Sequence, residues 1–255
     1  MADQSRMRPP ARAVIFDLDG VITSTASVHA AAWKAMFDEY LAKRAASRGE
    51  TFRPFDPDSD YRVYVDGKPR YDGAADFLAS RGIELPRGTP ADPADRETVC
   101  GLGNRKDEYF LRRLESDGAD VFPGTLALIE RLDARGVPMA VVSSSRNTRR
   151  ILSAAGVGRQ FDAIVDGVDA DELGLPGKPD PAVFLEAARR LAVDPAASVV
   201  IEDAIAGVEA GQRGGFGFVV GVDRTGHAAE LRAAGADLVV RDLSELDLLA
   251  LGLVP

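Results

Sequence analysis

The sequence predicts an α/β fold in which a helical segment is inserted into a doubly wound parallel sheet. Three observations support this prediction. From about residue 123 onward, short apolar runs alternate with helix-like stretches, as in a parallel sheet with helices on both faces. An apolar run at residues 13–16 predicts another buried strand near the start of the chain. Residues 29–120, in between, show helical periodicity without alternating strands.

The individual elements follow from the same patterns. Strands are expected where apolar and β-branched residues cluster, at residues 13–16, 137–142, 161–165, 198–201, 216–222 and 238–240. Helices are expected at residues 148–155, 181–191, 205–213 and 228–234, with Pro181 in the first turn of the second helix. Polar stretches at residues 51–60 and 86–95 interrupt the helical region. We therefore expect a Rossmann-like core domain of residues 1–26 and 121–255, and a helical cap domain of residues 27–120.

The composition excludes several classes of protein. The chain has 255 residues, 45% of them hydrophobic, and a net charge of −9, which suits a globular protein and disfavours nucleic-acid binding. The single cysteine, Cys100, rules out an internal disulfide and fits a reducing compartment. Residues 1–10 lack the apolar stretch of a secretory signal, and no apolar run could span a membrane. We expect a cytoplasmic monomer with no membrane or nucleic-acid partner.

Two acidic residues, Asp17 and Asp19, follow the first predicted strand. Two carboxylates about 4 Å apart at an effective dielectric constant near 20 repel each other by roughly 4 kcal/mol. A hard cation with oxygen ligands is the usual compensation for such a pair. The alternative interpretation of these residues alone is an Asx turn that ends the strand, with Gly20 at positive φ.

Polar residues also follow two other predicted strands. The sequence Ser-Ser-Ser-Arg-Asn at residues 143–147 follows the second strand, and Glu202 with Asp203 follows the fourth. Lys178 stands beside Pro179, just ahead of a predicted helix. Because ligands of an open parallel sheet bind beyond the carboxyl ends of its strands, we expect these side chains to meet in one crevice.

This order of residues resembles the haloacid dehalogenase superfamily of phosphoryl-transfer enzymes over nearly the whole chain. The sequence Asp-Leu-Asp-Gly-Val at residues 17–21 matches its first motif, and the other three motifs are matched by Ser143, by Lys178, and by Glu202 with Asp203. Within the superfamily the chain is most similar to the β-phosphoglucomutase-like family, which has a helical cap. This narrower resemblance rests on residues 19–25, His29, Trp33, residues 143–147 and residues 202–207.

The resemblance implies roles for the acidic residues of the core. Asp17 is the expected nucleophile, which takes the phosphoryl group as an aspartyl phosphate. Asp19 is the expected general acid and base. A Mg²⁺ cofactor is expected on the Asp17 carboxylate, the Asp19 backbone carbonyl and Asp203, with Glu202 as a further ligand or as a neighbour of the ligands.

The resemblance also implies contacts to the phosphate and the sugar. Ser143 is expected to hold phosphoryl oxygens, and Lys178 to bridge the phosphate and Asp17. In the cap, Arg70, which follows Gly67 in the expected specificity loop, would hold the phosphate that is not transferred. The remaining expected site residues are Thr25 in the hinge, grouped with the catalytic residues, and the substrate-binding set His29, Trp33, Lys106, Ser144, Ser145, Arg146 and Asn147.

Several cap residues have a structural alternative, and Lys68 or Arg105 would otherwise be solvated surface charges. His29 would otherwise belong to the first cap helix, and Trp33 to its apolar core. The chain also departs from the family pattern, because Ser24 replaces an acid found in many relatives and residues 51–60 and 86–95 lengthen the cap. These departures leave the local hydrogen bonding of the hinge and the identity of the sugar open.

The implied function is the interconversion of β-D-glucose 1-phosphate and glucose 6-phosphate. The alternative is a Mg²⁺-dependent phosphatase acting on a sugar phosphate or another small phosphomonoester, which shares the first half-reaction. Cationic cap residues such as Arg70 and Lys106 favour the mutase because they suit a second phosphate. A regulatory or scaffold protein without activity is a third interpretation, which the intact Asp17, Asp19 and Lys178 disfavour.

Overall fold

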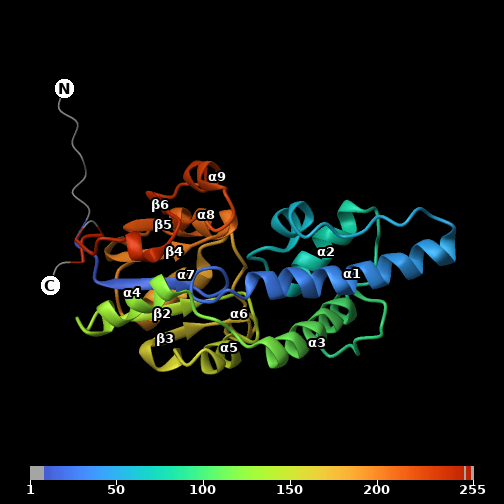
Figure 1. Cartoon of the computed structure of the whole chain (residues 1–255), viewed down its shortest axis with the longest axis horizontal. Helices are drawn as coiled ribbons and strands as arrows, with labels where there is room; N and C mark the ends of the chain where they lie inside the picture. Colours follow the sequence, from blue (N-terminus) through green and yellow to red (C-terminus); the bar gives the residue numbers. More distant parts are fainter. Residues whose placement is uncertain (1–8, 250, 254–255) are drawn as a thin grey trace. The chain divides into compact units, whose positions relative to one another are not determined.

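The computed structural model describes residues 9–249 and 251–253, so residues 1–8, part of the segment that argued against a secretory signal, lie outside the described residues. The chain divides into two compact units, one of Met1–Thr23 with Val121–Pro255 and one of Ser24–Asp120 (Figure 1). The chain passes from one unit to the other at residues 23/24 and 120/121. The domain boundaries expected from the sequence, 26/27 and 120/121, remain a prediction.

The first unit is built on a six-stranded parallel sheet with the strand order β3-β2-β1-β4-β5-β6. Its strands are β1 (Ala13–Asp17), β2 (Met139–Val142), β3 (Ala163–Val165), β4 (Ser198–Glu202), β5 (Phe218–Val222) and β6 (Leu238–Val240). The order reverses at β1, which pairs with β2 on one side and β4 on the other. This topology confirms the predicted doubly wound sheet.

Helices flank the sheet (Figure 1). Helix α7 packs against β1, β2 and β3, whereas α8 packs against β4 and β5 and α9 against β5 and β6. Phe184 of α7 lies in one buried cluster with Ile15, Val200 and Val219 of three strands. The helices of this unit are α4 (Pro123–Asp133), α5 (Thr148–Ala154), α6 (Gly167–Leu173), α7 (Ala182–Arg190), α8 (Ile205–Arg213) and α9 (Ala228–Ala233), with short 3₁₀ turns at Gly158–Gln160, Pro195–Ala197 and Leu243–Glu245.

The strand register decides which side chains meet at the carboxyl edge of the sheet. Asp17 lies opposite Val142, so Ser143 follows immediately beside it. On the other side Phe16 lies opposite Ile201, which brings Glu202 beside Asp17. The predicted strand ends are therefore neighbours, as the topology requires.

The second unit is helical, with α1 (Ala26–Arg48), a π-helix (Tyr61–Val65), α2 (Arg70–Ser80) and α3 (Val99–Asp117). Aromatic side chains fill its core, where the ring of Phe37 lies 4.1 Å from Phe77 and 5.3 Å from Phe55 between centroids. Phe55 belongs to the predicted polar interruption at 51–60. Its backbone N–H donates to Asp38 at 2.7 Å, and its carbonyl accepts from Lys34 at 2.9 Å, so this segment is tied to α1.

The other predicted interruption, residues 86–95, leads into α3 through a network of side-chain hydrogen bonds. The hydroxyl of Thr98 donates to Asp92 at 2.7 Å and accepts from the N–H of Gly101 at 2.9 Å, which caps the helix. The hydrogen bond from Thr98 lowers the pKa of Asp92. A second hydroxyl, that of Thr89, also donates to Asp92 at 3.1 Å. The extra residues of the cap are thus ordered against its own helices.

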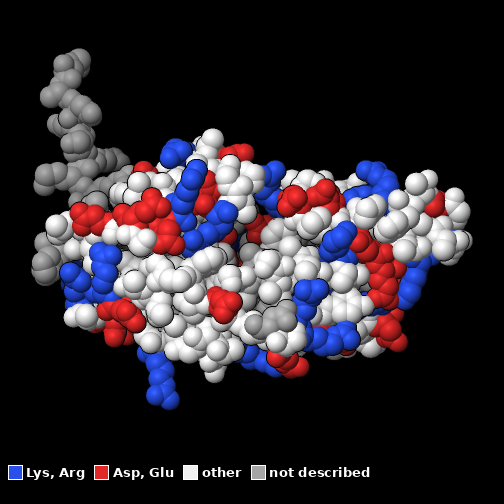
Figure 2. All heavy atoms as spheres, viewed as in Figure 1, with Lys and Arg blue, Asp and Glu red and all other residues white. Residues whose placement is uncertain are grey.

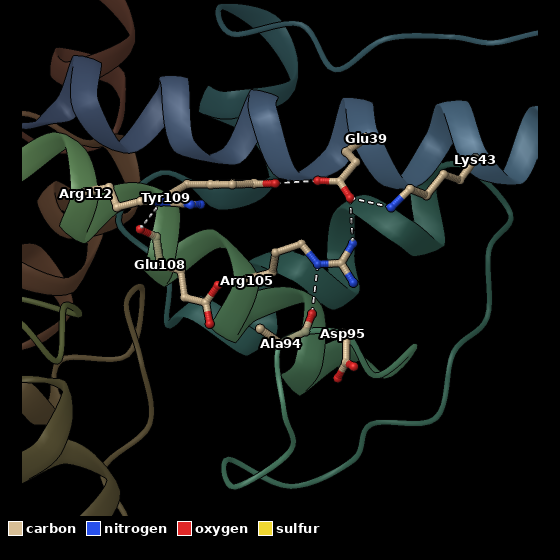
Figure 3. Close-up of a pocket in the computed structure, with 8 residues that line it drawn as sticks. All are labelled: Glu39, Lys43, Ala94, Asp95, Arg105, Glu108, Tyr109 and Arg112. Atoms are coloured by element: carbon tan, nitrogen blue, oxygen red, sulfur yellow. Dashed lines mark hydrogen bonds and ion pairs between the residues drawn. The ribbon is translucent and has the colours of Figure 1, made fainter.

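A surface cavity of about 570 Å³ lies within the second unit, lined mainly by α1 and α3 (Figure 3). One lining residue, Glu39, accepts hydrogen bonds from Lys43 and Tyr109 and lies 3.6 Å from Arg105. The hydrogen bond from Lys43 is the main reason that the pKa of Glu39 is lowered. Arg105 also donates to the carbonyl of Ala94 at 2.8 Å. These groups satisfy one another, so the network ties α3 to α1 and to residue 94.

The surface charges are mixed. On the face shown in Figure 2, Lys and Arg side chains are interspersed with Asp and Glu rather than joined into one basic surface of the kind that binds nucleic acid. Among the described helices, none is both long and apolar enough to cross a bilayer.

The structure differs from the sequence-based elements in three places. Helix α4 begins with Pro123 in its first turn, and α6 begins with a capping box formed by Asp166 and Asp169, but neither helix was predicted. Pro181 is the N-cap residue of α7 rather than a residue of its first turn, so this helix begins one residue later than expected. Helix α6 was not expected because residues 166–177 contain three glycines and several carboxylates, which is typical of a loop.

Candidate functional site

The centre of the candidate site is a buried lysine between two carboxylates. Lys178 precedes α7 and is joined to Pro179 by a cis peptide bond. Its Nζ donates to Oδ1 of Asp17 at 2.5 Å and also to Oε1 of Glu202. Lys178 is 4% exposed and Glu202 is fully buried, so water screens this triad poorly. The structure thus brings together the ends of β1 and β4 and the lysine, as predicted.

Negative charge exceeds positive charge around Asp17. Burial raises the pKa of Asp17 well above its ordinary value; Lys178 lowers it, while Glu202 and Asp19 raise it further. Burial alone would lower the pKa of Lys178, but the charges of Asp17 and Glu202 raise it above its ordinary value, so the lysine is an ammonium. One ammonium cannot neutralise the two buried carboxylates of Asp17 and Glu202 together with the half-buried Asp19 and Asp203. The site therefore favours a further cation.

A tight turn carries Asp19 and Gly20 after β1. The N–H groups of Ile22 and Thr23 both donate to the carbonyl of Leu18 at 2.9 Å, and the N–H of Gly20 donates to the carbonyl of Thr23 at 2.8 Å. Gly20 has a φ of +87°, and a Cβ at this position would lie 1.8 Å from Oδ2 of Asp203. Only glycine permits both the positive φ and this close approach. The turn with Gly20 at positive φ, closed by these backbone hydrogen bonds, is therefore part of the carboxylate site and not an alternative to it.

Three carboxylates could hold a metal ion at this edge of the sheet. Oxygen atoms of Asp17, Glu202 and Asp203 all lie within 4.8 Å of one another. The two oxygens of Glu202 already accept from Lys178 and from the N–H of Ala204 at 2.9 Å. An all-oxygen donor set with excess negative charge fits a hard divalent cation.

The segment after β2 supplies hydroxyl groups. Oγ of Ser143 donates to Oδ2 of Asp19 at 3.4 Å and accepts from the N–H of Ser145 at 3.0 Å. Oγ of Ser145 in turn accepts from the N–H of Asn147, which is 7% exposed, at 3.2 Å. These bonds shape residues 143–147, including Ser144, into a turn that leads into α5.

Arg146 of this segment has its charged partner on another helix. Its Nη1 forms an ion pair with Asp171 of α6, and its side chain is 36% exposed. The structure pairs this guanidinium with a surface carboxylate, and its expected contact with the substrate stays a prediction.

In the second unit the predicted residues form two groups. In the first group, Nζ of Lys106 lies 2.6 Å from Nδ1 of His29 and 5.2 Å from the ring centroid of Trp33. His29 stacks on Phe110 with 4.0 Å between ring centroids. Lys106 and Trp33 are each 4% exposed, so this predicted pair is part of the cap interior as well as a candidate contact. The N–H of His29 donates to the carbonyl of Thr25, which is 1% exposed.

The second group surrounds Arg70 at the start of α2. Its Nη2 donates to Asp107 at 2.7 Å, and its Nη1 lies 3.5 Å from Oδ1 of Asn104. The same Asn104 oxygen accepts from Tyr71, and its amide donates to the carbonyls of residues 90 and 92. Gly67, with a φ of +66°, turns the chain ahead of this helix. The segment of residues 86–95 is therefore linked to Arg70 through Asn104.

The loop after β5 was not among the predicted site segments. Asp223 and Arg224 directly follow that strand, and the guanidinium of Arg224 donates to the carbonyl of Gly20 at 3.0 Å. The signal was present, because these are charged residues at the carboxyl end of a predicted strand, as Asp17 and Glu202 are.

Comparison with known proteins agrees with this geometry. A family model described as haloacid dehalogenase-like hydrolase matches residues 11–215. The chain belongs to the haloacid dehalogenase-like hydrolase family, which confirms the resemblance inferred from its motifs.

Several known proteins are similar to the chain over almost its whole length. A β-phosphoglucomutase of Mycobacterium bovis is 55% identical over 238 residues, which cover 92% of this chain and 91% of the relative. A β-phosphoglucomutase of Bacillus subtilis is 36% identical over 237 residues, with coverage of 93% and 92%. The solved structure of β-phosphoglucomutase from Clostridium difficile matches with a TM-score of 0.73 at 26% identity, covering 93% of each chain.

Proposed function

We propose that this chain is a β-phosphoglucomutase, which interconverts β-D-glucose 1-phosphate and glucose 6-phosphate through an aspartyl phosphate on Asp17. The observation that carries the proposal is the buried carboxylate of Asp17, held at 2.5 Å by Lys178 at the carboxyl edge of the sheet. The 55% identity to a relative of that name over 92% of the chain supports the choice of reaction.

Asp17 is suited to attack phosphorus because its carboxylate is fixed and poorly solvated. Lys178 orients one oxygen of Asp17, and Glu202 orients the lysine by accepting from the same ammonium. This leaves the ammonium positioned to stabilise charge on the transferring oxygens. The new bond joins an Asp17 oxygen to phosphorus, and the bond that breaks joins phosphorus to the sugar oxygen.

Asp19 is the proposed acid and base. It would give a proton to the leaving sugar oxygen and later accept one from the attacking hydroxyl. Ser143, whose Oγ lies 3.4 Å from Oδ2 of Asp19, would donate to a phosphoryl oxygen.

Mg²⁺ is the proposed cofactor, with Asp17 and Asp203 as side-chain ligands and the Asp19 carbonyl as the backbone ligand. When bound, it would supply the positive charge that the site lacks and would neutralise phosphate oxygens. Because both oxygens of Glu202 are already hydrogen-bonded, its proposed role is to hold Lys178 and complete the negative field around the ion.

Arg70 is the proposed ligand of the second phosphate, and Lys106 and His29 are proposed as further substrate contacts from the cap. A phosphate would compete with Asp107 for the Arg70 guanidinium, because both anions suit the same planar donor. A phosphosugar substrate, a monomeric state and a cytoplasmic location complete the proposal.

The decisive assay supplies β-glucose 1-phosphate, Mg²⁺ and a trace of glucose 1,6-bisphosphate, and follows glucose 6-phosphate and free phosphate in parallel. We expect glucose 6-phosphate without a matching release of phosphate. Stoichiometric release of phosphate would replace the mutase by the phosphatase. Asp17→Asn should lower turnover by about 10⁴-fold or more, since it removes the nucleophile, and unchanged turnover would reject both enzymes.

A further inference from the structure

The loop after β5 is folded by a single carboxylate. Oδ1 of Asp223 accepts from the N–H groups of Gly226 at 2.6 Å and His227 at 2.7 Å. These bonds close a tight turn at the carboxyl edge of the sheet, and Arg224 projects from this turn. The base of the Arg224 side chain is therefore fixed before its guanidinium makes any contact.

The guanidinium of Arg224 joins two other segments of the first unit. Its Nε donates to the carbonyl of Gly20 at 3.0 Å, and its Nη1 donates to the carbonyl of Arg241 at 3.0 Å. Nη1 also lies 3.5 Å from Oδ2 of Asp242. The Arg224 side chain is only 17% exposed. A planar guanidinium can donate in these separate directions, which the ammonium of a lysine cannot reproduce with the same geometry.

The face of the same guanidinium lies on an aromatic ring. The central carbon of Arg224 is 3.6 Å from the ring centroid of Phe122, a stacking contact at partly desolvated side chains. The N–H of Phe122 donates to the carbonyl of Ile22 at 3.0 Å. Arg224 thus contacts both parts of the chain at which the first unit ends and resumes, Gly20 just before Ser24 and Phe122 just after Asp120.

The Gly20 carbonyl is a sensitive point in the proposed site. Gly20 follows Asp19 directly, and its Cα faces the carboxylate of Asp203 so closely that an added Cβ would lie 1.8 Å from Oδ2. A shift of the Gly20 peptide would therefore displace the Asp19 backbone and change the space beside Asp203. Errors of about 1 Å in such groups can cost about 100-fold in rate.

We propose that Arg224 is a positioning residue for phosphoryl transfer, which fixes the Gly20 peptide and through it Asp19 and the space around Asp203. This inference rests on the proposed function of Asp17, Asp19 and Asp203. It assigns no contact between Arg224 and the substrate. The competing role is purely structural, in which Arg224 stabilises the fold and leaves the geometry of the site unchanged.

The test compares Arg224→Ala and Arg224→Lys with Arg232→Ala, an exposed arginine of the following helix α9. We expect Arg224→Ala to lower kcat by about 10- to 100-fold with KM for the sugar phosphate changed by less than about threefold. Its affinity for Mg²⁺, measured by calorimetry without substrate, should fall by about tenfold or more. Arg224→Lys should show a smaller loss of both, and Arg232→Ala none.

Thermal unfolding separates positioning from folding. Wild-type kcat and Mg²⁺ affinity in folded Arg224→Ala would overturn the proposal, as would equal losses in Arg232→Ala. If Arg224→Ala does not fold, Arg224→Lys decides by the same two measurements, and failure of both to fold makes Arg224 a folding residue and the proposal wrong. Activity that survives Asp17→Asn would instead refute the proposed function itself.

Discussion

Replacement of Lys178 by methionine tests the charge balance of the site most sharply. Methionine keeps an unbranched stem of similar length near the ring of Phe184, whose centroid lies 4.9 Å from Nζ, but removes the ammonium. The side chain of Lys178 is 1% exposed, and its two partners, Asp17 and Glu202, are 10% and 0% exposed. Removing one partner of a buried ion pair costs about 3–5 kcal/mol, so Lys178→Met should lose about this much stability at neutral pH without metal.

The loss should depend on pH in a defined direction. Burial already raises the pKa of Asp17 in the folded protein, and removal of the ammonium raises it further. A carboxyl group with a higher pKa in the folded than in the unfolded protein destabilises the fold once the pH exceeds its pKa in the unfolded protein. The destabilisation reaches its full size only when the pH also exceeds its pKa in the folded protein. The deficit of Lys178→Met should therefore shrink as the pH falls toward the unfolded value of an aspartate.

The assay is denaturant unfolding of the wild type and Lys178→Met in EDTA across this pH range. Lys43→Met is the control, because the Lys43 and Glu39 side chains are 71% and 33% exposed and their pair should contribute less than about 1 kcal/mol. A loss below about 1 kcal/mol at neutral pH, or a loss that stays constant as the pH falls, would refute the charge argument.

Three further changes should have separate effects. Gly20→Ala, whose Cβ would lie 1.8 Å from Asp203 at a φ of +87°, should lower kcat by about 100-fold or more, and wild-type turnover would contradict the close approach. Asp17→Asn should raise the thermal midpoint in EDTA at neutral pH by about 2–4 °C for each kcal/mol of relieved repulsion, whereas a lower midpoint would show that the raised pKa of Asp17 does not burden the fold. Arg70→Ala should reduce mutase turnover about 100-fold but hydrolysis of a small aryl phosphate by less than about threefold, and equal losses would remove its assigned role.

The fold and the centre of the site could be predicted because both follow from periodic and local signals. Apolar runs placed all six strands, and acidic residues at two strand ends marked the edge where Asp17 and Glu202 meet. In a parallel sheet this edge is shared by every strand, so position along the chain already implies proximity. Lys178 lies 161 residues from Asp17, and it was expected in the same crevice because it precedes a predicted helix. Only its contact with Asp17 and the phosphate came from the family resemblance.

The orientation of individual long side chains could not be predicted in the same way. Arg146 follows Ser143 in the expected motif, yet its guanidinium pairs with Asp171 of α6, a helix that the sequence pattern did not reveal. Arg224 reaches Gly20 across 204 residues, and nothing local to Arg224 indicates that partner. Such contacts depend on which loops the fold brings together.

The central claim is that Asp17 accepts the phosphoryl group. Rapid acid quench of the enzyme with Mg²⁺ and a phosphoryl donor, followed by peptide mass spectrometry, tests this claim most directly. A phosphate on the peptide that contains Asp17, absent from Asp17→Asn, is the predicted result. Phosphate on another residue, or the same labelling in Asp17→Asn, would contradict the account.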